Sequence, residues 1–219
     1  MFNLIFKDIL IQRKSLLFGV IYVFVLILCF QDTGITMFLT SAIGFSYMMI
    51  QSACAYDDKN KSDILLNSLP ISRNTIVVSK YVSAFVFSGI SIVVYSLLTV
   101  IINLLKLPIK VSPITLEGVI GILFAIVLMC GIYFPVYFKI GYIKSKVYNF
   151  ILIFGILFLT TTLLPAILGD KSKVIIQILT KFFSSQSDLI IAIKMLILII
   201  LFFSISCMIS LNIYRKREF

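Results

Sequence analysis

The sequence contains no histidine, and only 13% of its 219 residues are charged. Without histidine the chain lacks the side chain that most often acts as a general base near neutral pH, and it also lacks a common metal ligand. The charged fraction is far below the roughly 25% of ordinary soluble domains. Both shortages argue against a soluble enzyme.

The sequence also lacks the motifs that would bind nucleotide or support catalysis inside a membrane. There is no Gly-x-x-x-x-Gly-Lys-Ser/Thr loop, so this chain is not expected to bind ATP by that route. No carboxylate pair occurs in the middle of an apolar run, which disfavours an intramembrane enzyme. Four cysteines without Cys-x-x-Cys spacing are interpreted as inert buried thiols: Cys29, Cys54, Cys130 and Cys207. No cofactor or metal is expected in this chain.

Apolar residues, by contrast, make up 61% of the chain. A single hydrophobic core in a chain of 219 residues cannot bury so many apolar side chains, so some of them are expected to face lipid. A membrane helix needs about 20 apolar residues. We therefore predict an all-α integral membrane protein with one transmembrane domain, residues 1–219, and six transmembrane helices. The predicted spans are about 16–30, 34–55, 76–105, 114–138, 147–168 and 189–213.

Basic residues give the expected orientation. Nineteen lysines and arginines outnumber nine acidic residues, and most of them lie in the two tails or in and beside the second and fourth connections between spans. The positive-inside rule then places both termini and these connections in the cytoplasm of a cell-membrane protein. The anionic partner indicated by this charge is the lipid surface rather than a nucleic acid.

Residues 1–14 have the pattern of an amphipathic helix in the cytoplasmic interface, with its basic face toward lipid headgroups. Two interpretations remain open. The helix either anchors the first span or acts as an elbow helix that braces a cytoplasmic partner. The residues that mark this helix are Phe6, Lys7, Arg13 and Lys14.

The connection 56–75 begins with strongly polar residues and continues into a short apolar segment. Ser62 is expected to cap a helix that Pro70 stops, and Ser72 is expected to cap the next helix. Lys80, in that next helix, is expected to extend back to the interface. The short helix carries too much apolar surface to face water uncovered, so it rests either on the membrane or in a groove of another protein.

The connection 169–188 is predicted to be an extracellular amphipathic loop. Its apolar residues recur at helical spacing, which indicates an interfacial helix or a short re-entrant pair. We leave open whether it rests on the membrane or gates an exit path.

The segment from Asp57 to Tyr81 resembles the coupling segment of ABC-2 type permeases of bacterial exporters. In that family charged residues precede a Leu-x-Ser-Leu-Pro-x-Ser-Arg pattern, which is matched here from Leu66 to Arg73. The amphipathic N-terminal segment and the six predicted spans extend the resemblance over essentially the whole chain. Within this family the chain is similar to permeases that export phenol-soluble modulins, which are amphipathic peptides.

The resemblance implies a type V exporter-like fold with an elbow helix and a short cytoplasmic coupling helix. It also implies nucleotide-binding ATPase subunits as partners, which would supply ATP and Mg²⁺ chemistry, and a second permease chain, identical or related. The residues that it assigns to ATPase coupling are Asp57, Lys59, Lys61, Asp63, Leu65, Leu66, Leu69, Pro70, Ser72 and Arg73.

Small and hydroxylated residues in the second and fifth predicted spans have two interpretations. They pack helices within one chain, or they line an interface between two permease chains along which the substrate passes. The candidate residues are Ser41, Ser46, Gln51, Thr160, Thr161 and Thr162. A rival function for the whole chain is a non-transport scaffold or an immunity protein against membrane-active peptides, which would work without an ATPase.

Overall fold

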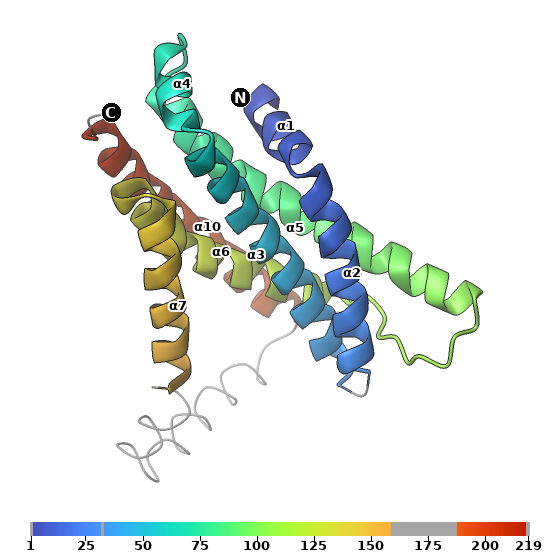
Figure 1. The fold of residues 1–219 in the computed structure, drawn as a ribbon. Coiled ribbons are helices and arrows are strands. Elements are labelled where there is room, and N and C mark those ends of the chain that lie inside the picture. The colour runs from blue at the N-terminus through green and yellow to red at the C-terminus, as the bar shows by residue number, and fades with distance from the viewer. Residues whose placement is uncertain (1, 32, 159–187, 218–219) are drawn as a thin grey trace.

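The computed structural model describes residues 2–31, 33–158 and 188–217, and all regular secondary structure in this part is helical. Figure 1 shows helices that run side by side, with α3 in front of α5, α6 and α10. The helix bounds are α1 Phe2–Ile11, α2 Arg13–Cys29, α3 Ile35–Lys59, α4 Ser62–Ser68, α5 Arg73–Leu104, α6 Leu116–Ile140, α7 Tyr142–Phe158 and α10 Asp188–Arg215.

Four of the described helices are long and apolar enough to cross a membrane: α3, α5, α6 and the part of α10 from Ile190 to Arg215. The pair α1 and α2, bent by 67°, would add a fifth span if it crosses as one unit. The predicted class of all-helical membrane protein is therefore confirmed. The number six stays a prediction, because the span 147–168 lies partly outside the described residues and the loop 169–188 almost wholly so.

One end of the bundle carries α1, α4, the start of α5 and the last turn of α10 (Figure 1). We call it the α4 end. The first and last described helices thus reach the same end, which agrees with an expectation that both termini share one side of the membrane. That this side is cytoplasmic remains the prediction of the charge pattern.

The capping residues around α4 agree only in part with the prediction. Ser72 caps α5 as expected, because its hydroxyl accepts a hydrogen bond from the Thr75 backbone N–H at 3.3 Å. Ser62 does not cap α4 but is its first residue, and Lys61 precedes it with a left-handed backbone (φ 49°). The helix ends at Ser68, two residues before Pro70, as a stop signal there predicts.

A buried polar and aromatic group fixes α10 to α5 and α6. The ring of Tyr81 lies 4.8 Å from that of Phe134 and 5.1 Å from that of Phe203, measured between centroids. The Tyr81 hydroxyl is 2.7 Å from both Ser206 and Ser210, and Ser206 donates to the Gly131 carbonyl at 2.7 Å. Every polar atom of this group has a partner, as a lipid-embedded core requires.

Close helix contacts explain two of the glycines. A side chain at Gly131 would overlap the ring of Phe202 in α10, and one at Gly19 would overlap the ring of Phe45 in α3. Small residues allow such close approach, which drives helix association where lipid removes the hydrophobic effect. The contact between α6 and α10 is the most extensive among the described helices.

Candidate functional site

The short helix α4 exists as predicted, and it presents an apolar face to the outside. Leu65 is 63% exposed, and Ile64 and Leu69, which directly follows the helix, are also more than half exposed. Leu66 differs, because it is only 9% exposed and belongs to the hydrophobic core. Helical periodicity turns Leu66 inward while its neighbours face out, so its part in ATPase coupling stays a prediction that its exposure does not support.

The other residues assigned to coupling are also partly buried and partly exposed. Asp57 is buried, whereas Asp63 lies in α4 but its side chain is not among those described. The exposed members are Lys59, Lys61, Pro70, Ser72 and Arg73.

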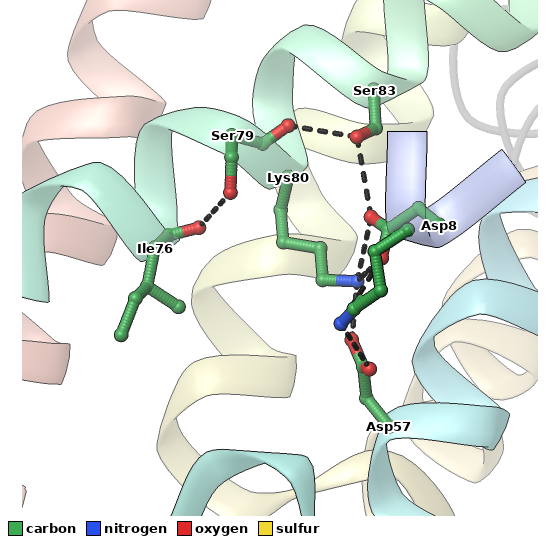
Figure 2. A network of polar contacts seen from close by, with 7 residues as sticks. Asp8, Asp57, Ile76, Ser79, Lys80 and Ser83 are labelled. Atoms are coloured by element: carbon green, nitrogen blue, oxygen red, sulfur yellow. Dashed lines mark hydrogen bonds and ion pairs between the residues drawn. The ribbon is translucent and has the colours of Figure 1, made fainter. Parts of the chain in front are cut away.

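Asp57 belongs to a group of four charged side chains, three of them buried and Lys7 partly exposed, which we call the ion cluster: Lys7, Asp8, Asp57 and Lys80 (Figure 2). The Lys80 Nζ lies 3.0 and 2.9 Å from the two carboxylate oxygens of Asp8 and also pairs with Asp57. The Lys7 Nζ lies 2.8 Å from Asp57 Oδ1 and 3.3 Å from Asp8 Oδ1. The Ser83 hydroxyl donates to Asp8 Oδ2 at 3.2 Å.

The ion cluster is balanced in charge, with two carboxylates and two ammonium groups. Asp8 and Asp57 are each 4% exposed, so neither could stay ionised here without a partner. Lys80 was expected to extend to the interface, and that expectation is wrong. Its side chain reaches two carboxylates within the bundle, and this pairing replaces hydration.

Helix α1 contributes side chains from both of its faces to the bundle. Asp8 of its polar face and Ile5 of its apolar face are buried, and so is Gln12 just after the helix, whereas Phe2 and Phe6 are exposed. Asp8 can turn inward because Lys80 neutralises its charge there. Beyond α1, Arg13 and Lys14 are exposed at the bend into α2, as an interfacial position requires. An elbow role for this helix remains a prediction.

The ion cluster was not identified from the sequence, although one signal was available. A lysine inside an apolar helix usually needs a buried acidic partner. The sequence shows Lys80 near the start of α5 but does not show which carboxylate faces it. The partners come from α1 and α3: Asp8 lies 72 residues before Lys80 in the sequence, and Asp57 lies 23 residues before it.

A second set of contacts joins the last turn of α10 to α4 and α5, and it also went unpredicted. The Asn67 side-chain amide of α4 donates to the Tyr214 hydroxyl at 3.1 Å. The Arg73 guanidinium donates to the carbonyl oxygens of Arg215 and Arg217, at 2.8 and 3.2 Å. The Arg215 Nε donates in turn to the Asn74 side-chain oxygen at 2.8 Å. These contacts form what we call the α10 clamp.

Of the residues expected along a translocation interface, the structure describes only Ser41, Ser46 and Gln51, all in α3. Ser41 and Ser46 are fully buried, and Ser46 donates to the Ala42 carbonyl of its own helix, which favours packing within this chain. Gln51 donates to the Tyr47 hydroxyl, which links α3 to Asn149 of α7. The remaining candidates, Thr160, Thr161 and Thr162, lie outside the described residues.

Comparison with known proteins gives one match that spans the site. A family model described as "ABC-2 family transporter protein" matches residues 3–215, which include the ion cluster, α4 and nearly all of the α10 clamp. No curated protein and no solved structure is similar enough to match.

Proposed function

The chain belongs to the ABC-2 family of transporter proteins, and from that premise we propose that it is the permease of an exporter whose ATP is hydrolysed by a separate subunit. Membership of this family supports the role of a membrane transport component that works with an ATP-binding subunit. The sequence has no phosphate-binding loop of its own, which fits this division of labour.

One observation carries the assignment of the coupling site: α4 holds an apolar face at the end of the bundle. Ile64, Leu65 and Leu69 are all more than half exposed there. A short helix that presents adjacent apolar side chains fits the groove of a partner protein, which is a common mode of helix recognition. We propose that this groove belongs to the ATPase subunit.

The ion cluster supports a mechanical role for α4. The helix lies between the end of α3, which carries Asp57, and the start of α5, which carries Lys80. Lys80 pairs with Asp57 and also with Asp8 of α1. A displacement of α4 by the ATPase would therefore move three helices together, and α1 would carry it to the bend at α2.

For the substrate we propose an amphipathic peptide or a hydrophobic toxin or antibiotic, and for the assembly a second permease chain. Both proposals rest on the resemblance of segment 57–81 to exporter permeases. They fit the apolar outer faces of α2 and α5, where Phe18 and Leu97 are among the exposed side chains. Such faces suit contact with lipid or with a second membrane chain.

The decisive experiment is purification of the native complex in mild detergent, with its mass measured, for wild type and for Leu65→Asp. We expect wild type to retain an ATPase, and Leu65→Asp to lose both the ATPase and transport while its thermal stability stays near that of wild type. Leu65→Met is the matched control, because it keeps an apolar side chain of similar volume.

Leu66→Asp tests the inward position of the neighbouring residue. Because it places a charge in the core, we expect it to lower the melting temperature, in contrast to Leu65→Asp. If wild type purifies without any ATPase and protects cells from membrane-active peptides on its own, the transporter proposal is wrong and the immunity protein is favoured. If Leu65→Asp retains its ATPase, α4 is not the docking helix.

A further inference from the structure

The last turn of α10 lies beside α4, although the two segments are far apart in the sequence. The contact between Asn67 and the Tyr214 hydroxyl joins residues 147 positions apart. Arg73, at the start of α5, binds two carbonyl oxygens at the end of α10. A cationic side chain at that position suits the partial negative charge of a helix C-terminus.

The exposed charge on this surface is mainly basic. Arg215 is exposed at the end of α10 and Lys216 just after it, Lys59 and Lys61 are exposed just before α4, and Asp58 is the exposed acidic side chain beside them. Two of the acidic residues near this end, Asp8 and Asp57, are buried and neutralised by lysines in the ion cluster. Their negative charge is therefore not presented to a partner at the surface.

We propose that residues 214–217, which comprise the end of α10 and the two residues after it, form the second half of the docking surface and bind an acidic patch beside the ATPase groove that receives α4. This inference rests on the proposed function. Apolar side chains from α4 would form the centre of the interface, and Lys216 and Arg215 would form a basic rim. Protein interfaces commonly combine an apolar core with a polar rim, and charges at the rim mainly accelerate association.

The α10 clamp gives this surface a fixed geometry. Arg73 and Asn67 hold the end of α10 against the α4–α5 junction, so the two halves are presented together before the partner arrives. Such preorganisation reduces the entropy lost on binding. The bond from Arg215 to Asn74 also directs this guanidinium toward the α4–α5 junction. These contacts favour a protein partner over lipid headgroups.

Lys216→Glu tests the inference, and Lys106→Glu is its matched control. The control makes the same charge change at an exposed lysine just after α5, at the opposite end of that helix from Arg73. The permease is placed in nanodiscs of zwitterionic lipid, and binding of its co-purified ATPase is followed in real time at low and high salt. We expect Lys216→Glu to slow association by about 3- to 10-fold at low salt, with little change in dissociation. The Lys106→Glu variant is expected to match wild type.

The remaining outcomes separate the two proposals. If Lys216→Glu associates like wild type while Leu65→Asp does not bind, the end of α10 is not part of the docking surface and the proposed function stands. If Leu65→Asp also binds like wild type, the proposed function fails. If Lys216→Glu is defective only in nanodiscs that contain anionic lipid, residue 216 contacts headgroups and the inference is wrong.

Discussion

Replacing Lys80 with methionine is expected to be highly damaging, because it leaves two buried carboxylates with one ammonium group. In the intact ion cluster Lys80 contacts both Asp8 and Asp57, and its side chain is only 7% exposed. Methionine has a similar length, so the change removes the charge with little change in shape. The ion cluster then carries one uncompensated negative charge in the interior.

The size of the effect follows from that uncompensated charge. Removing one partner from a buried ion pair costs about 3–5 kcal/mol, which raises the unfolded fraction by about 10²- to 10⁴-fold. For chains of this length each kcal/mol lowers the melting temperature by about 2–4 °C, so we expect a fall of about 6–20 °C. Lys7→Met is expected to cost less, because the Lys7 side chain is 27% exposed and water can compensate.

A charge-balanced double variant provides the control. Asp8→Asn combined with Lys80→Met leaves Asp57 paired with Lys7, so the ion cluster is again neutral. We expect this double variant to recover at least half of the stability lost by Lys80→Met alone. Additive losses in the double variant would show instead that the two side chains do not interact.

Two buried thiols give a direct assay for this prediction. Cys54 and Cys130 are both buried, so an alkylating reagent reaches them only when the bundle opens. Mass spectrometry after heating in detergent would report each thiol separately and give a melting temperature for each variant. If Lys80→Met melts within about 2 °C of wild type, or if the double variant is no more stable than the single one, the ion cluster does not hold these helices together.

Two further predictions concern helix contacts away from the ion cluster. Tyr214→Phe removes the hydroxyl that binds α4, so we expect a loss of about 1 kcal/mol and faster amide hydrogen exchange in α4; unchanged exchange would contradict the clamp. Gly131→Ala places a methyl group against the Phe202 ring, so we expect a loss of about 1–3 kcal/mol in thermal unfolding. Gly89→Ala, which meets no atom within 4 Å, is its control and is expected to be neutral or stabilising.

The helices themselves were largely predictable, because lipid requires long apolar runs. The differences lie at the ends of the helices. The span predicted at 34–55 is part of a helix that continues to Lys59, and the apolar span predicted at 76–105 belongs to a helix that begins at Arg73, where the expected Ser72 cap places its start. Polar residues do not end a helix where capping and backbone geometry allow it to continue beyond the apolar run.

The candidate site was predictable only where its signal was local. The short helix α4 and the Ser72 cap of α5 follow from adjacent residues, and both were found. The ion cluster and the clamp depend on which distant segments meet, and a single sequence does not show that pairing. In α1 the pattern predicts the helix but not the burial of Asp8, which becomes favourable only when Lys80 is known to lie opposite it.

The ion pairs of α1 have a consequence for biosynthesis. Asp8 is neutralised by a lysine 72 residues later, and Lys7 pairs with an aspartate 50 residues later. At about 5–20 residues per second, the ribosome needs about 4–14 s after Asp8 before it has made Lys80. Until then Lys7 is the only ammonium group of the ion cluster that has been made, and once Asp57 is added it faces two carboxylates. Helix α1 therefore reaches its charge-balanced place in the bundle only after the start of α5 has been synthesised.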